Sequence, residues 1–376
     1  MLALSNADRI LTPIAQCYKV MQESWNDRRS HPDPFGWLRI TYGVYMSTET
    51  RAVISTSPGK TEFGAFQMPD PGDGEVQVRT ELSTISVGTE GWVLLNKFTW
   101  AATVYPNVPG YQRVGTVVAC GDGVTDWKPG DRCMATVGSW QGPVVPFWGS
   151  HGEILNTRAS ELYRIPNGVD DIDASGLVVA QVGYNAAFRP TLSTGDWVVV
   201  YGDGLIGQSG AQAARARGAK VILVGHRAER LELAAKHSAD YVINSNDCNS
   251  AEEARKIIGG CANVVIDTVQ NESCQTQYLP LLEYAKGQVV YSGFTPGTAW
   301  ADMGRLQQME LTAHFVAGWT RERMESTLNL MAEGKMSIKS LITHHMPAQN
   351  APEAYDMIIG KSKSFLGITL DWRNLD

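Results

Sequence analysis

Residues 197–224 read WVVVYGDGLIGQSGAQAARARGAKVILV, and this stretch decides the fold. An apolar run leads into Gly202, Gly204 and Gly207, followed by an alanine-rich segment and a second apolar run. The order predicts strand, glycine turn, helix and strand. Gly202 allows the tight turn, Gly204 lets backbone N–H groups approach a pyrophosphate, and Gly207 lets the helix close on the strand. We expect a nicotinamide dinucleotide at the helix N-terminus; the alternative is an ordinary α/β turn without phosphate.

The end of the second strand bears on which dinucleotide binds. A carboxylate about 20 residues past the first glycine would hold the ribose 2′-hydroxyl of NAD. The chain instead has Gly225, His226 and Arg227 there, with Arg230 one turn further on. Arg227 could pair with a 2′-phosphate, which no acid at this strand end would repel. We therefore expect NADP(H) rather than NAD(H), the alternative being that these cations form a solvated first turn of the next helix.

Composition restricts the class of protein. The chain has 376 residues and a formal net charge of −7. Two domains are expected at this length, and the acidic balance argues against nucleic acid or an anionic membrane as partner. Six cysteines without C-x-x-C spacing indicate thiols in a reducing compartment. No long apolar run or signal-peptide core is found, so we expect a cytoplasmic protein.

The chain divides into unlike parts. Residues 1–45 form an extension: a disordered arm or a start-site artefact, or alternatively a partner-binding arm. From residue 51 to about 165, short strands with Gly and Pro between them predict an all-β module. From about 180 to 318, six strands alternate with helical stretches, including 251–258 and 275–285, which predicts a doubly wound parallel sheet. An amphipathic helix is expected over 321–332.

From about residue 51 to its end, the chain resembles the medium-chain dehydrogenase/reductase superfamily. The resemblance rests on the glycine turn and on Val87-Gly88-Thr89-Glu90, Val108-Pro109-Gly110-Tyr111-Gln112, Lys128-Pro129-Gly130-Asp131-Arg132 and Ile266-Asp267-Thr268-Val269. It implies an α/β fold: a Rossmann domain over 181–329 and a GroES-like β-rich catalytic domain over 46–180, completed by 330–376. The active site would lie between them. The residues expected to bind the cofactor are Gly202, Gly204, Leu205, Ile206, Gly207, Gly225, His226, Arg227, Arg230, Thr268 and Gly293.

Shorter segments resemble one subfamily, the bacteriochlorophyllide a dehydrogenases. They are Ser86-Val87-Gly88-Thr89-Glu90, Leu341-Ile342-Thr343-His344, Ala351-Pro352-Glu353-Ala354-Tyr355 and Leu370-Asp371-Trp372-Arg373. This likeness implies a substrate with a hydroxyethyl group on a chlorin ring.

The chain departs from the zinc-dependent members of the superfamily. Those members place a Cys before Gly-Thr-Asp, a His-Glu pair after Pro-Gly, and a Cys or acid near the domain junction. Here the positions hold Val87, residues 111–112 (Tyr and Gln), and residues 178–180 (Val, Val and Ala). Zinc needs about three protein ligands, and His151 and Glu153 would still lack a third. We therefore expect no zinc and no metal ligands.

Without a Lewis acid, a positioned side chain must polarise the substrate oxygen and handle its proton. Tyr111 is the first candidate, because it stands where a side chain would otherwise reach the metal. His151 is the second, because its ionisation range suits acid–base work. Either could instead serve packing alone, and Thr89 and Glu90 are expected to hold the loop and orient these groups.

These features together predict an oxidoreductase. The resemblance implies a zinc-independent, NAD(P)-dependent enzyme that interconverts a secondary alcohol and a carbonyl; the alternatives are an NADPH-dependent quinone or ene reductase and a non-catalytic NADPH-binding protein. Four aromatic side chains either line an apolar substrate pocket or belong to the core: Trp92, Trp140, Phe147 and Trp148. We expect a small-molecule substrate and a homodimer, with no nucleic acid or membrane as partner.

Overall fold

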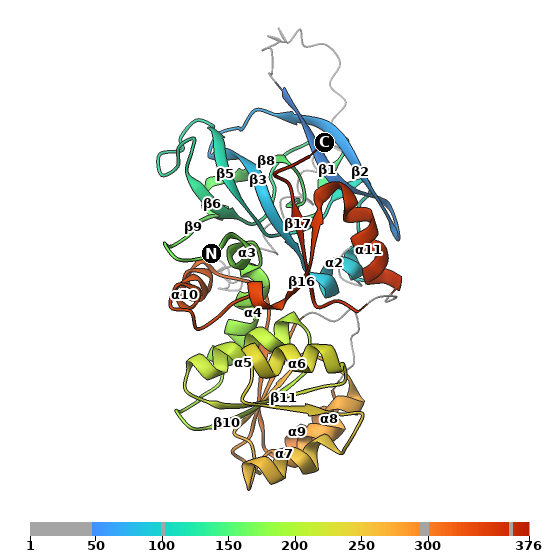
Figure 1. The fold of residues 1–376 in the computed structure, drawn as a ribbon, viewed down its shortest axis with the longest axis vertical. Coiled ribbons are helices and arrows are strands. Elements are labelled where there is room, and N and C mark those ends of the chain that lie inside the picture. The colour runs from blue at the N-terminus through green and yellow to red at the C-terminus, as the bar shows by residue number, and fades with distance from the viewer. Residues whose placement is uncertain (1–46, 99–101, 294–300, 361–363, 376) are drawn as a thin grey trace, which may run out of the picture. The chain divides into compact units, whose positions relative to one another are not determined.

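The computed structural model describes residues 47–98, 102–293, 301–360 and 364–375. The expectation for the N-terminal extension therefore lies outside the described residues. Residues 46–376 form one compact unit, with a sheet-and-helix lobe and a β-rich lobe (Figure 1). In the described part of the chain, no helix combines the length and low polarity that crossing a bilayer requires.

The sheet-and-helix lobe is built on six parallel strands in the order β12-β11-β10-β13-β14-β15. The sequence order reverses between β10 and β13, which makes their carboxyl ends the switch point of a doubly wound sheet. This arrangement confirms the predicted Rossmann fold. The strands are β10 (Trp197–Tyr201), β11 (Lys220–Gly225), β12 (Tyr241–Asn244), β13 (Val264–Asp267), β14 (Gln288–Ser292) and β15 (Thr312–Val316).

Helices cover both faces of this sheet (Figure 1). Residues alternate along the strands, so Val198 and Val200 pack on one face whereas Val199 and Tyr201 pack on the other. The apolar runs are therefore buried on both sides, as is usual for parallel strands. The first face packs against α4 (Leu177–Phe188), α5 (Leu205–Ala216) and α6 (Ala228–His237), and the second against α7 (Ser250–Ile258), α8 (Glu272–Tyr278) and α9 (Met303–Gln308).

The β-rich lobe contains a seven-stranded sheet that the C-terminal strands complete. Its order is β16-β17-β3-β5-β6-β9, with β8 also pairing with β3. The strands are β3 (Glu75–Ile85), β5 (Arg113–Cys120), β6 (Arg132–Ala135), β8 (Ile154–Arg158), β9 (Leu162–Arg164), β16 (Ile342–Pro347) and β17 (Gly367–Asp371). A smaller sheet has the order β2-β1-β4-β7, formed by β1 (Ser47–Ser57), β2 (Lys60–Pro69), β4 (Asn107–Val108) and β7 (Val145–Pro146).

The described residues form four further α-helices. They are α2 (Val87–Leu94), α3 (Asp171–Ser175), α10 (Arg321–Ala332) and α11 (Ala351–Gly360). The prediction of a helix over 321–332 is confirmed, whereas the helix predicted over 275–285 is wrong in its bounds. The Asn271 side chain caps α8 by accepting from the Cys274 N–H at 2.8 Å, so the helix begins earlier. It ends at Tyr278, just before a 3₁₀ turn that contains Pro280.

The glycine turn gives a matched pair of stability predictions. A Cβ on Gly207 would lie 2.0 Å from the Gly202 carbonyl oxygen, whereas a Cβ on Gly204 would meet no described atom within 4 Å. We expect Gly207→Ala to lower the free energy of unfolding by roughly 2 kcal/mol, as overpacking does. Gly204→Ala should stay within about 0.5 kcal/mol of the parent. Urea unfolding followed by circular dichroism measures both, and equal stabilities would contradict the close-contact argument.

Candidate active site

A pocket of about 400 Å³ lies over the glycine turn at the carboxyl end of β10. Nine of the eleven predicted cofactor residues line it: Gly202, Gly204, Leu205, Ile206, Gly207, His226, Arg227, Arg230 and Thr268. The β-rich lobe contributes Ser86, Val87, Gly88 and Leu366. Gly225 and Gly293 are not in the lining. The pocket is therefore bordered by both lobes, as the resemblance implied.

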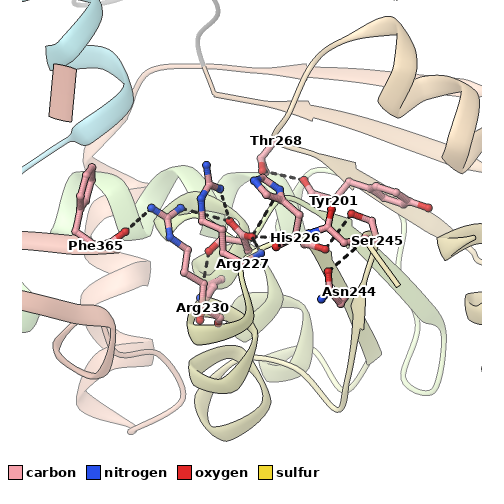
Figure 2. A network of polar contacts seen from close by, with 12 residues as sticks. Tyr201, His226, Arg227, Arg230, Asn244, Ser245, Thr268 and Phe365 are labelled. Atoms are coloured by element: carbon pink, nitrogen blue, oxygen red, sulfur yellow. Dashed lines mark hydrogen bonds and ion pairs between the residues drawn. The ribbon is translucent and has the colours of Figure 1, made fainter. Parts of the chain in front are cut away.

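The turn has the geometry that an anion site needs. Gly202 has φ +118°, and a Cβ there would lie 2.1 Å from Thr268 Oγ1. Thr268 in turn donates to the Tyr201 carbonyl at 2.9 Å (Figure 2). Helix α5 begins directly after Gly204, and no side chain caps its first N–H groups. These backbone donors and the positive end of the helix dipole suit a pyrophosphate.

Asp203, which lies between the first two glycines of the turn, was not among the residues predicted for the site. Its side chain is only 3% exposed. One carboxylate oxygen, Oδ2, accepts from the backbone N–H groups of His226 and Arg227, both at 3.0 Å. The other, Oδ1, accepts from the Arg227 and Arg230 guanidinium groups at 3.1 and 3.3 Å. A carboxylate offers about four acceptor positions, so the described protein groups occupy all of them.

The position of Asp203 corrects the expectation that the strand end carries no acid. The carboxylate comes from the preceding turn rather than from the strand. A Cβ on Gly225 would lie 2.6 Å from the Asp203 Cβ, so Gly225 is the residue that makes room for it. Burial raises the pKa of Asp203, but the two N–H donors and the two guanidinium groups outweigh that effect and hold the pKa below its usual value. The acid is ionised and fully engaged.

Arg230 connects the turn with the C-terminal segment. Figure 2 shows Arg230 close to Arg227 and reaching toward Phe365, whose carbonyl accepts from Arg230 Nη2. The Arg230 Nε atom is buried and has no hydrogen-bond partner among the described residues. Arg227 is 45% exposed, so its guanidinium remains accessible at the pocket.

Tyr111 lies in an aromatic cluster beside the pocket. Its ring stacks on Trp319 at 5.8 Å and meets Trp148 edge-on at 5.1 Å. Burial raises the pKa of the Tyr111 phenol above its usual value of 10, while the Ser86 and Thr89 hydroxyls lower it by smaller amounts. The phenol is thus protonated at neutral pH. Ser86 also lines the pocket, which places the Tyr111 hydroxyl next to it.

Only part of the predicted aromatic set joins this cluster. Phe147 packs on Trp148 at 4.9 Å, whereas Trp140 is 9% exposed and stacks on Phe66 within a core cluster. Trp92 packs edge-on against Phe98. Trp319, which the sequence analysis missed, follows β15 and is 208 positions from Tyr111 in the sequence.

His151 and Glu90, the latter a residue of α2, form a buried network. Both side chains are 0% exposed, and His151 Nε2 lies 2.9 Å from Glu90 Oε2. The other ring nitrogen lies 2.8 Å from Ser83 Oγ, which accepts from Trp372 Nε1 at 2.8 Å. Tyr355 donates to the same Glu90 oxygen. Neither His151 nor Glu90 lines the pocket, so their geometry suits positioning rather than contact with a ligand.

The network fixes the turn that borders the pocket. Glu90 Oε1 accepts from the backbone N–H of Ser86 at 2.7 Å, directly before α2. Gly110, with φ +85°, leaves the space that the imidazole fills, because a Cβ there would lie 2.4 Å from the His151 ring. Glu90 therefore holds the loop through the Ser86 backbone, and the loop-holding role expected of Thr89 stays a prediction.

Gln112, at one of the expected zinc positions, has both of its amide atoms hydrogen-bonded to backbone. Gln112 is fully buried, and its amide donates to the Thr84 carbonyl at 3.0 Å. Its oxygen accepts from the N–H groups of Val178 and Val179 at 3.0 and 3.2 Å. Glu153 pairs with Arg51 at 3.0 Å. Across the described ranges, no three His, Cys, Asp or Glu side chains gather in a group that could hold a metal ion.

Two family models match the chain. The alcohol dehydrogenase GroES-like domain matches residues 72–167, and the zinc-binding dehydrogenase domain matches residues 206–333. The two matched segments coincide with much of the β-rich lobe and of the parallel sheet.

Known proteins match most of the chain. An alcohol dehydrogenase from Moraxella sp. strain TAE123 is 27% identical over 330 residues, or 81% of this chain and 94% of the relative. A 2-desacetyl-2-hydroxyethyl bacteriochlorophyllide A dehydrogenase from Cereibacter sphaeroides is 28% identical over 339 residues, which cover 86% of this chain and 98% of the relative. A solved structure described as a short chain alcohol dehydrogenase from Escherichia coli CFT073, complexed with NADH, shares the fold. Its TM-score is 0.75 at 21% identity, covering 86% of this chain and 99% of that one.

The engaged Asp203 carboxylate predicts a pH-dependent stability. Asp203→Asn removes a buried charge that faces two arginines, and we expect it to lower the free energy of unfolding by about 3 kcal/mol at pH 7. Because the folded-state pKa is lowered, the ionised carboxylate stabilises the fold above the ordinary aspartate pKa of 3.8, and this contribution is lost as pH falls further. Urea unfolding of both proteins between pH 7 and pH 3 should show the difference shrinking in acid. A difference that is independent of pH would contradict the ion-pair account.

Proposed function

Because the chain belongs to the medium-chain dehydrogenase/reductase superfamily and is an enzyme of the alcohol dehydrogenase/reductase class, we propose that it interconverts a secondary alcohol and a carbonyl compound. The reaction is a hydride transfer with a nicotinamide cofactor and does not use zinc. The observation that carries the proposal is the position of the Tyr111 phenol. The phenol is buried outside the pocket lining and lies beside Ser86, which does line the pocket.

The pocket has backbone donors and open space that suit the pyrophosphate of a dinucleotide. Gly202 and Gly204 leave the backbone open to a pyrophosphate, and the uncapped N-terminus of α5 supplies donors. When bound there, the nicotinamide would give or take the hydride. Two guanidinium groups face one carboxylate at the end of β11, leaving a net positive charge that favours NADP(H) over NAD(H). Asp203 has no free acceptor position for a ribose hydroxyl, which also favours this choice.

In this proposal, Tyr111 supplies the hydrogen bond to the substrate oxygen. During carbonyl reduction its hydroxyl donates a hydrogen bond to the oxygen on which negative charge develops. The raised pKa keeps the phenol protonated for this role. Glu90 and His151 act through the backbone, because they hold Ser86 and the start of α2 in place. Thr89 lies close enough to the phenol to orient it.

The substrate in this proposal has an apolar or aromatic body. Trp148 and Trp319 contact the Tyr111 ring from two sides, so aromatic side chains lie next to the proposed oxygen-binding residue. The Cereibacter relative, whose name specifies a hydroxyethyl group on a bacteriochlorophyllide, supports a large flat ring as the substrate class.

A substrate panel tests the proposed reaction. We expect NADPH to drive reduction of aryl ketones and NADP to drive oxidation of the matching secondary alcohols. Chelators should leave the rate unchanged, because Val87, Tyr111, Gln112 and Val178 offer no typical zinc ligand. Cofactor absorbance measures turnover, and elemental analysis measures zinc in the undepleted protein. Turnover confined to quinones or enones, or one zinc per chain lost together with activity, would overturn the proposal.

Removal of one hydroxyl tests the role of Tyr111. Tyr111→Phe keeps the ring between its tryptophan neighbours, so we expect kcat to fall by roughly 100-fold while the KM for the cofactor holds. Tyr163→Phe is the matched control, because Tyr163 is a buried tyrosine of the same lobe and Ser86 is not among the groups that act on its phenol. The parent enzyme should show no loss of carbonyl reduction from phenol ionisation below pH 10. Equal kcat values for the parent and Tyr111→Phe would assign the hydrogen bond to another group.

A further inference from the structure

A second cavity of about 630 Å³ adjoins the pocket over the glycine turn. The two share Val87, Gly88, Arg227 and Arg230 in their linings. Lys97 also lines the second cavity, from the chain just past the C-terminal end of α2 in the β-rich lobe. The cavity thus begins at the end of β11 and continues toward the β-rich lobe.

The charged side chains in the lining of this cavity are all cations. They are Lys97, Arg227 and Arg230, and none of the described lining residues is Asp or Glu. Two carboxylates lie nearby, but both have partners. Asp203 accepts four hydrogen bonds, and Glu229 accepts from the Ser364 hydroxyl.

The arginines retain capacity for a further anion. Asp203 engages Nη1 of each guanidinium. Arg227 is 45% exposed, and the buried Arg230 Nε has no partner among the described residues. A planar guanidinium can bind a phosphate with two parallel hydrogen bonds, and a lysine ammonium adds a point charge. Three cations around one cavity therefore suit a phosphate monoester.

We propose that Lys97, together with Arg227 and Arg230, forms the seat of the adenosine 2′-phosphate of NADP(H). This inference rests on the proposed function, because it places the phosphate at the end of β11, where a doubly wound sheet binds the adenosine ribose. Lys97 is then a specificity-determining residue that the catalytic lobe supplies to the cofactor. The phosphate contacts both lobes, so NADP(H) receives a contact that NAD(H) lacks.

The test compares dissociation constants for NADPH and NADH, measured by quenching of tryptophan fluorescence. We expect Lys97→Met to raise the dissociation constant for NADPH about tenfold, the size of one lost charge-assisted contact. The dissociation constant for NADH should stay within about twofold of the parent value. Lys97→Arg should retain most of the NADPH affinity, and Arg227→Met should weaken NADPH selectively. Lys256→Met is the charge-matched control, because Lys256 is exposed on α7 and pairs only with Glu253 in the described contacts. It should bind both cofactors as the parent does.

Each outcome separates this inference from the proposed function. If Arg227→Met weakens NADPH binding while Lys97→Met does not, the role of Lys97 is overturned and the NADP(H) preference stands. Equal weakening of both cofactors by Lys97→Met would also overturn it, because it would show a structural role. If the parent prefers NADH and Arg227→Met changes neither constant, the proposed preference fails as well.

Two nucleotides distinguish a 2′-phosphate seat from a site for an acidic substrate. Adenosine 2′,5′-bisphosphate should displace NADPH from the parent about tenfold better than 5′-AMP, and this advantage should disappear in Lys97→Met. An equal effect of the two nucleotides on the parent would overturn the proposed seat.

Discussion

The geometry of the pocket over the glycine turn depends on one buried carboxylate, that of Asp203. Burying a charge is costly unless it is paired and hydrogen-bonded, and here two backbone N–H groups and two guanidinium groups meet that need. These contacts join the glycine turn to the end of β11 and the start of α6. Through Arg230 they extend to the carbonyl of Phe365. Gly225 is required because any larger side chain would occupy the space of the carboxylate.

A second buried carboxylate, that of Glu90, holds backbone in place in the β-rich lobe. Glu90 accepts from the Ser86 backbone N–H and from the Tyr355 hydroxyl, and its Oε2 lies 2.9 Å from His151 Nε2. Here Gly110 provides the space, since the imidazole lies where its Cβ would be. Both carboxylates thus hold backbone that borders the same pocket. Gln112, at one of the expected zinc positions, has a similar role, because its amide links strand β3 to the start of α4.

The elements of the fold were accessible from the sequence because they rest on local rules. Apolar runs of strand length, a glycine spacing that only a tight turn explains, and helices with one apolar face each predict structure from neighbouring residues. The six strands of the parallel sheet were all anticipated, and most of the predicted cofactor residues line the pocket. The boundaries of α8 were not, since a cap at Asn271 and the 3₁₀ turn at Pro280 shifted them.

The sequence by itself determined the parallel sheet, the glycine turn and the residue types at the positions expected to hold zinc. Only the tertiary structure decided which polar groups meet. The sequence shows Asp203 between two glycines and shows that Arg227 and Arg230 carry the opposite charge. It does not show that they pair, because these partners are more than 20 positions away. Tyr355 reaches Glu90 across 265 positions. Such contacts depend on how strands and helices pack, because a buried charge takes whichever donors the fold brings within hydrogen-bond distance, and no local pattern records that choice.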